Sequence, residues 1–330
     1  MKIAHVRERH APAGTPWRLA AALDPDATRW LGLEEARRAL VAAEPARAHN
    51  SVLFRQPITT LDAHLARGLR VDALADLLEA AVDEPLDASA LDFGPPILDP
   101  PAFRDFYAFE QHVGTMWRRR NMDIPEAWYR LPIFYFSNTS EIRGPGDPVW
   151  APRGSTELDY ELEVAALVDT PVRDLEATRG EEAIGGYTIL NDWSARDLQR
   201  EETTVRLGPA KGKDFASSIG PWLVTPDELA DARRDKGYDL TMTATVNGEE
   251  LSRGTWASAQ FSFGEMIERA SADVRLRPGD LIGSGTVGTG CLLEIRDEKL
   301  GRYLEPGDTV TLAIERLGSL TAAVVERSSR

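Results

Sequence analysis

The chain has 330 residues, of which 42% are hydrophobic, and a formal net charge of −15 at pH 7. The negative charge argues against nucleic acids and anionic membranes as partners, because their phosphate groups would repel the protein. Cys291 is the single cysteine, which excludes an internal disulfide, and no run of eighteen apolar residues occurs, so we expect a soluble, cytoplasmic protein.

Residues 1–95 are expected to form a small α/β domain. Strand patterns cover residues 2–6 and 17–23, a helical pattern covers 33–43, and a second helical pattern begins at Val71. The segment 94–101 contains four prolines and can be neither regular helix nor central strand. We therefore place a boundary there and assign residues 96–330 to a larger domain.

The segment 102–119 is predicted to be a helix that begins just after Pro101. Asp105 and His112 are seven residues apart, which places them on one face of a helix, about 20° from perfect alignment. On this pattern alone, His112 is by default a surface histidine, and the arginines at 118–120 are a solvated helix end.

An acidic stretch at 157–168 is predicted to be a strand with two different faces. Glu157, Asp159, Glu161 and Glu163 alternate with apolar residues, so the four carboxylates would share one side. Two neighbouring carboxylates of this face could bind one hard divalent cation through oxygen. Taken alone, an edge strand whose acids face water is the favoured alternative.

The next elements place further polar residues at the end of a strand. A buried strand at 184–190 ends at Asp192, and Ser194 is a candidate cap for a short helix at 195–199. Arg196 and Gln199 would share a face of that helix. The glycine-punctuated loop 207–215 carries Lys213 but lacks the Walker spacing, which disfavours nucleotide binding.

The C-terminal third contains a hairpin signal and a glycine-rich segment. Asn247 and Gly248 predict a type I′ turn between two strands, residues 263–270 a helix, and residues 281–283 and 310–314 strands. The glycines of 283–290 would allow backbone N–H groups to approach a ligand. Glu294 lies inside an apolar run, where an unpaired charge would be costly, so a buried partner is implied.

Six short blocks, taken together and in order, resemble the fumarylacetoacetate hydrolase family. They read D-F-Y-A-F-E-Q-H, L-D-Y-E-L-E, N-D-W-S-A-R-D-L-Q, L-G-P-A-K-G-K, G-S-G-T and G-C-L-L-E, and the similarity covers about residues 95–320. The resemblance implies an α+β, β-rich fold: a catalytic domain of rolled mixed β-sheet at 96–330 behind the small N-terminal domain. It also implies a homodimer and a divalent metal held by carboxylates, with Mg²⁺ first and Ca²⁺ or Mn²⁺ as alternatives.

The resemblance also assigns roles to thirteen side chains. The metal ligands would be Asp105, Glu161, Glu163 and Asp192, which agrees with the acidic face. His112 matches the general base and Glu294 the carboxylate that orients it. The groups around the substrate and its oxyanion would be Arg196, Gln199 and Lys213, with the further substrate contacts Tyr107, Arg118, Tyr135 and Thr286.

The activity implied by the resemblance is hydrolysis of a carbon–carbon bond in a 1,3-dicarbonyl acid, as in the breakdown of aromatic compounds. Where fumarylacetoacetases carry a substrate-contacting tyrosine after the D-W-S-A-R-D block, this chain has residues 200–204, R-E-E-T-T. This departure favours a different acylpyruvate as substrate. Decarboxylation, hydration or isomerisation of a 2-oxo acid is the enzymatic alternative, and a protein that only binds a metal and a metabolite is the non-enzymatic one.

Overall fold

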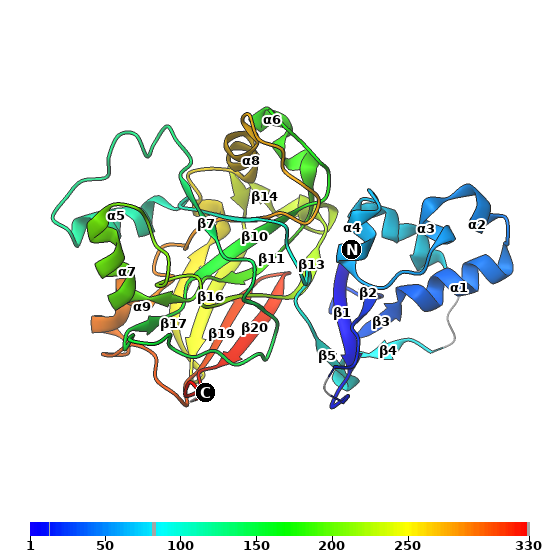
Figure 1. Ribbon diagram of the computed structural model, residues 1–330, viewed down its shortest axis with the longest axis horizontal. Helices are drawn as coiled ribbons and strands as arrows, with labels where there is room; N and C mark the ends of the chain where they lie inside the picture. The colour runs from blue at the N-terminus through cyan, green and yellow to red at the C-terminus, as the bar shows by residue number, and fades with distance from the viewer. Residues whose placement is uncertain (13, 81–83, 329–330) are drawn as a thin grey trace.

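The structure is a computed structural model that describes residues 1–12, 14–80 and 84–328. Among these residues, a 12-stranded mixed sheet and a 4-stranded antiparallel sheet dominate, and helices lie around them (Figure 1). The large sheet has the order β4-β3-β2-β1-β13-β11-β10-β18-β6-β7, with β5 paired to β1 and β8 to β13. The expected α+β, β-rich fold is confirmed.

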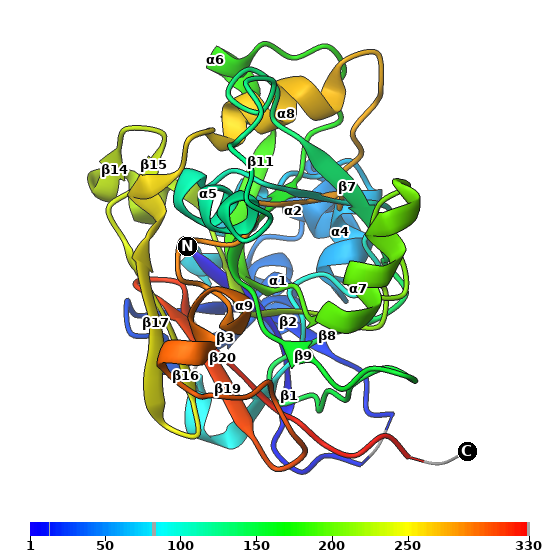
Figure 2. The ribbon, with the colours of Figure 1, turned by 90° about the vertical axis from the view of Figure 1, so that its left-hand side faces the viewer.

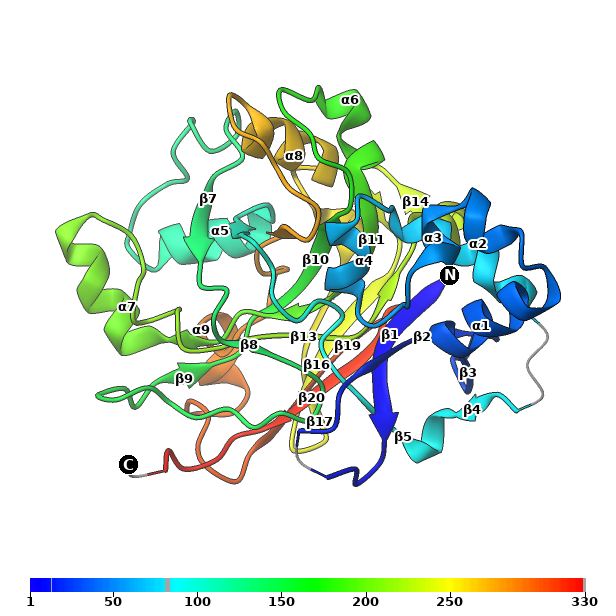
Figure 3. The same cartoon turned by 45° about the vertical axis from the view of Figure 1, so that its right-hand side comes forward.

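The N-terminal segment adds its strands to this large sheet. β1 (Lys2–Glu8) pairs antiparallel with β13 (Ser217–Val224), with Ile3 opposite Leu223. Next to β1 lie β2 (Arg18–Ala22) and β5 (Leu91–Phe93), and β3 (Arg29–Gly32) and β4 (Leu86–Asp87) follow β2. The helices beside them (Figure 3) are α1 (Leu33–Ala43), α2 (Arg47–Asn50), α3 (Val52–Arg55), α4 (Leu61–Ala66) and a 3₁₀ helix (Val71–Glu79).

The centre of the large sheet brings distant segments together. β10 (Leu162–Val168) pairs antiparallel with β11 (Ile184–Asn191) and with β18 (Leu281–Gly283). β18 in turn pairs parallel with β6 (Phe103–Phe106), which places Gly283 opposite Asp105, and β7 (Phe134–Ser137) follows β6. Every residue of β10 and β11 is buried, so both faces of the sheet are covered here.

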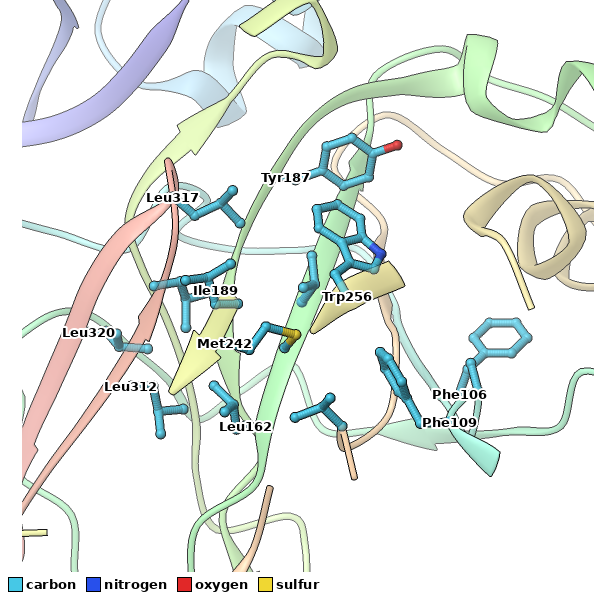
Figure 4. Close-up of a cluster of buried hydrophobic side chains, with 14 of the residues drawn as sticks. Phe106, Phe109, Leu162, Tyr187, Ile189, Met242, Trp256, Leu312, Leu317 and Leu320 are labelled. Carbon is cyan, nitrogen blue, oxygen red and sulfur yellow. The ribbon is translucent and has the colours of Figure 1, made fainter. Parts of the chain in front are cut away.

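The smaller sheet packs against this centre. Its order is β17 (Glu249–Thr255), β16 (Thr241–Val246), β19 (Thr309–Ile314), β20 (Gly318–Ala323). Asn247 and Gly248 have φ values of 54° and 84°, which confirms the expected type I′ turn between β16 and β17. Side chains of the two sheets meet in one buried core (Figure 4), including Leu162, Met242 and Leu312. Burial of these apolar side chains supplies the main stabilisation of the fold.

The other short elements connect or cover the sheets. The remaining helices are α5 (Glu110–Arg118), α6 (Ala177–Gly180), α7 (Arg196–Glu202), α8 (Phe263–Ser271) and α9 (Leu292–Ile295), and the remaining strands are β8 (Ile142–Arg143), β9 (Leu158–Asp159), β12 (Ser194–Ala195), β14 (Arg233–Arg234) and β15 (Gly237–Tyr238). Short 3₁₀ turns occur at Ala88–Ala90, Glu181–Ala183, Thr203–Val205, Pro226–Ala232, Trp256–Ser258 and Arg296–Glu298.

The expected helix over residues 102–119 is wrong in its first half. Residues 103–106 form strand β6, and the helix begins only at Glu110. All four residues of β6 are buried, and pairing with β18 and β7 satisfies their backbone groups. Asp105 and His112 therefore do not share a helix face, because Asp105 lies on the strand and His112 on α5.

The prediction of one continuous strand at 157–168, with a solvent-exposed acidic face, is also wrong. The strand is interrupted at Tyr160 and Glu161, where the Glu161 N–H donates to Asn191 Oδ1 at 2.9 Å instead of continuing a ladder. Asp159 and Glu163 are 0% exposed and Glu161 is 5% exposed. The acids are thus interior groups that need partners, which excludes the solvated edge strand.

The helix expected at 195–199 is shifted. α7 begins at Arg196, and its N-cap residue Ala195 provides no side-chain cap. The Ser194 hydroxyl donates instead to the Asp192 carbonyl oxygen at 3.2 Å, because Ser194 belongs to β12 and pairs with Asp159 of β9. Ser194 is therefore not the helix cap.

Candidate active site

Four buried carboxylates converge at one end of the central strands. Asp105 comes from β6, Glu163 from β10 and Asp192 from the residue after β11, and one oxygen of each lies within 4.8 Å of the others. Glu161 lies just before β10 and joins this group through Lys213. The register of the central strands creates the cluster: β18 joins β6 to β10, and β10 pairs with β11, so carboxylates from three separate segments meet.

The donor set fits a hard divalent cation. Within the described part of the chain, Asp105 Oδ1 and Asp192 Oδ1 are buried without a hydrogen-bond partner. Burial and the nearby charge of Asp192 raise the pKa of Asp105, and burial and the charge of Asp105 raise the pKa of Glu163. A cation with carboxylate ligands would satisfy the open oxygens and relieve the crowding of negative charge.

Two basic side chains balance part of this charge. The Lys213 ammonium contacts both Glu161 and Asp192, and Arg196 Nη2 donates to Glu161 Oε1 at 2.9 Å. Burial by itself raises the pKa of Glu161, but the charges of Lys213 and Arg196 outweigh burial and lower it. Glu161 is therefore held as a carboxylate even without a metal.

A histidine–carboxylate pair lies beside the cluster. His112 Nδ1 is 2.5 Å from Glu294 Oε1, and the two side chains are 5% and 3% exposed. Their helices, α5 and α9, pack against one another (Figure 2). The Thr289 N–H donates to Glu294 Oε2 at 3.1 Å and fixes the carboxylate. His112 is thus the buried partner that the apolar surroundings of Glu294 required.

Asp159 connects the two halves of the site and was not assigned a role from the sequence. It accepts hydrogen bonds from Arg196 Nε at 2.7 Å and from the N–H groups of Leu292 and Leu293 at 2.7 and 3.0 Å. Asp159 therefore holds α9, which carries Glu294, to the guanidinium that binds Glu161. The acidic alternation pointed to this residue, but its burial against α9 arises only from tertiary packing.

Two expected substrate contacts bind the carboxylates in this structure. The Tyr135 hydroxyl donates to Asp192 Oδ2 at 2.5 Å, and the Thr286 hydroxyl donates to Glu163 Oε1 at 3.1 Å. Both hydroxyls therefore lie within the cluster and orient it. The Gly285 N–H also donates to Glu163, at 3.0 Å, so the glycine-rich segment approaches a carboxylate of the chain itself.

The other expected contacts lie at different distances from the cluster. The Tyr107 ring packs edge-on against His112, with ring centroids 5.4 Å apart. Gln199 Oε1 accepts from Arg196 Nη1 at 3.1 Å, which places it at the edge of the site. Arg118 is exposed at the end of α5 and donates to Thr115, so the structure does not bring its guanidinium into the cluster.

An open cavity of about 320 Å³ adjoins the cluster at Tyr135 and Lys213. Its walls come from β7 and from the loop after α7, and it is lined by Tyr135, Phe136, Ser137, Asn138, Pro209, Ala210, Lys213 and Asp214. This volume suits a small metabolite.

Comparison with known proteins identifies the family of this chain. The family model "Fumarylacetoacetate (FAA) hydrolase C-terminal" matches residues 102–325. A 2,4-didehydro-3-deoxy-L-rhamnonate hydrolase from Sphingomonas sp. (strain SKA58) is 32% identical over 209 residues, which are 62% of this chain and 68% of that protein. The chain belongs to the fumarylacetoacetate hydrolase family, and the resemblance seen in the sequence is confirmed.

Solved structures agree on the fold. A fumarylacetoacetate hydrolase from Exiguobacterium antarcticum superposes with a TM-score of 0.72 at 23% identity, covering 99% of this chain and 100% of that one. A probable 2-hydroxyhepta-2,4-diene-1,7-dioate isomerase from Mycobacterium abscessus superposes with a TM-score of 0.66 at 23% identity, covering 100% of both chains. Among the described residues, no helix has the length and apolarity needed to cross a bilayer.

Proposed function

We propose that the protein is a divalent-metal-dependent hydrolase that cleaves the carbon–carbon bond between the two carbonyls of a 1,3-dicarbonyl acid. An acylpyruvate is the leading substrate class. The observation that carries this proposal is the buried His112–Glu294 pair beside four converging carboxylates and Lys213. Together these groups supply a base, a metal site and a positive charge within one small region.

The His112–Glu294 pair supplies the proton transfer. With the Nδ1 proton donated to Glu294, the lone pair of His112 Nε2 accepts a proton from water as the water oxygen attacks the distal carbonyl. Glu294 stabilises the imidazolium that forms. The carbon–carbon bond then breaks with its electron pair on the leaving carbon, and the imidazolium returns its proton there, which gives a carboxylic acid and a 2-oxo acid.

Lys213 and Gln199 are assigned to the oxyanion, and Arg196 fixes Glu161 and Gln199. Loss of one oxyanion donor is expected to reduce kcat about 10²- to 10³-fold. Asp105, Glu161, Glu163 and Asp192 would hold the cation, for which we propose Mg²⁺ before Ca²⁺ or Mn²⁺. When bound, the cation supplies positive charge that polarises the substrate oxygens and stabilises the charge developing on them.

The test is hydrolysis of an acylpyruvate panel by chelated protein to which Mg²⁺, Mn²⁺ or Ca²⁺ is returned. Loss of the 1,3-dicarbonyl absorbance reports cleavage. His112→Ala should abolish turnover, whereas His49→Ala, which changes an exposed histidine, should keep the wild-type rate. Full turnover by His112→Ala would exclude the assigned base.

The runner-up is an isomerase, decarboxylase or hydratase of a 2-oxo acid. The neighbour from Mycobacterium abscessus carries an isomerase description, and a histidine base beside a metal could also move a proton between two carbons. Product analysis separates these cases, because only hydrolysis yields two acids from one. A protein that only binds a metal and a metabolite would bind the cation but leave every panel member intact.

We also propose a homodimer in the cytoplasm, acting in the breakdown of aromatic compounds. The dimer and the pathway rest on the family resemblance. A reducing compartment suits a chain whose single cysteine is free and buried. Light scattering after gel filtration measures the oligomeric state, and a monomeric mass would contradict the dimer.

A further inference from the structure

The single cysteine of the chain lies against the histidine–carboxylate pair, and the proposed hydrolysis does not use it. Cys291 is fully buried at the N-terminus of α9. Its thiol points at the pair, since Sγ donates to Glu294 Oε1 at 3.7 Å. One ligand atom each of His112, Cys291 and Glu294 lies within 4.8 Å of the other two.

These three side chains differ in kind from the carboxylate cluster. An imidazole nitrogen, a sulfur and a carboxylate oxygen are ligands that Zn²⁺ takes, and three protein ligands leave one position for water. The Asp105, Glu163 and Asp192 group offers only oxygen and suits Mg²⁺ or Ca²⁺. Two neighbouring groups thus favour different cations, because thiolate selects soft metals and carboxylate selects hard ones.

We propose that His112, Cys291 and Glu294 form a second cation site for thiophilic divalent metals such as Zn²⁺, and that its occupation switches off the enzyme. The binding claim rests on geometry and ligand chemistry alone. The inhibition claim rests on the proposed function, in which His112 Nε2 is the base.

The inhibition follows from where the protons go. The ion forms bonds to His112 Nδ1, Cys291 Sγ and Glu294 Oε1, and the thiol proton leaves to solvent. The imidazole proton moves from Nδ1 to Nε2, so Nε2 no longer has a lone pair to accept a proton from water. Two tetrahedral ligand atoms lie about 3.3 Å apart, so the 2.5 Å contact between His112 and Glu294 must open.

The binding test uses Co²⁺ as the probe, added to chelated full-length protein. Thiolate bound to Co²⁺ gives a charge-transfer absorption in the near ultraviolet, and with one cysteine in the chain it can arise only from Cys291. The band should appear in the wild type, vanish in Cys291→Ser and be displaced by Zn²⁺. Asp105→Asn, which alters only the oxygen cluster, should keep the band.

A wild-type protein that binds Co²⁺ without this band would overturn the site. Circular dichroism shows whether Cys291→Ser is folded, and if it is not, the wild-type band and its displacement by Zn²⁺ still decide the question. This readout needs no substrate, so it stands even where the acylpyruvate panel shows no turnover.

The inhibition test measures, for each protein separately, how much added Zn²⁺ lowers its Mg²⁺-supported rate. The rate in Zn²⁺ plus Mg²⁺, divided by the rate in Mg²⁺ alone, should fall about 10²-fold in the wild type, as for loss of a general base. In Cys291→Ser this ratio should stay near one. A cobalt band without any inhibition by Zn²⁺ would refute the inhibitory role, and equal inhibition of both proteins would assign the effect to the oxygen cluster instead.

Discussion

Replacing Glu294 with glutamine tests the proton-transfer pair most directly, because it removes a charge and keeps the shape. The contact with His112 Nδ1 is 2.5 Å long and both side chains are almost fully buried. Two unit charges about 4 Å apart interact by about 4 kcal/mol at an effective dielectric constant of about 20. This stabilisation acts only once the imidazolium forms, so its loss raises the barrier and should lower kcat about 10³-fold.

The assay is steady-state hydrolysis of the best acylpyruvate from the panel, with kcat and KM measured separately. KM should change little, because Glu294 acts through His112. Glu298→Gln is the matched control, since Glu298 is exposed in the turn after α9 and should keep the wild-type kcat. A Glu294→Gln variant that is folded and retains kcat within a few-fold would refute the assignment of the pair.

Three further changes test the rest of the site. Asp159→Asn should lower the free energy of unfolding in urea by about 3 kcal/mol, because the buried guanidinium of Arg196 loses a charged partner. The control Asp297→Asn, at an exposed position, should cost less than about 1 kcal/mol. Similar losses in the two variants would contradict a structural role for the buried ion pair. Asp105→Asn should raise the melting temperature of the metal-free protein, because one crowded buried acid is removed. In thermal scans, Mg²⁺ should raise the melting temperature of the wild type but not that of Asp105→Asn. A variant that is still stabilised by Mg²⁺ would count against the metal site. Gly285→Ala and Gly146→Ala both place a side chain at positive φ, 78° and 82°, which costs about 1–2 kcal/mol of unfolding free energy. Gly285→Ala should cost more in urea unfolding, because its Cβ would lie 2.4 Å from a carbonyl oxygen, whereas no described atom lies within 4 Å of a Cβ at Gly146. Equal losses of unfolding free energy in the two variants would contradict the close packing at Gly285.

Elements with strong local signals were predictable from the sequence. The helix at Leu33–Ala43 and the Asn247-Gly248 hairpin occur as expected, because spacing and turn chemistry decide them within a few residues. The strand at Phe103–Phe106 was mistaken for helix, since its partner β18 lies far along the chain. The boundary near residue 95 stays a prediction, and β1 joins the large sheet at β13.

The candidate site was likewise predictable from the sequence only in part. The inventory of carboxylates, histidine and lysine could be read from ordered motifs, and the apolar run around Glu294 required a buried partner. No local pattern could show that Lys213 contacts Glu161 and Asp192, because that contact depends on strands and loops that meet only in the folded chain.

The amino-acid sequence by itself determined the family, several of the strands, such as β1, β11 and β19, and the kinds of ligand atom available. Only the tertiary structure decided which charges are buried together, how Asp159 ties α9 to Arg196, and that Cys291 lies against the His112–Glu294 pair. The physical reason is that electrostatic strength and metal preference depend on distance and burial. Both quantities are set by the register between segments that are remote in sequence.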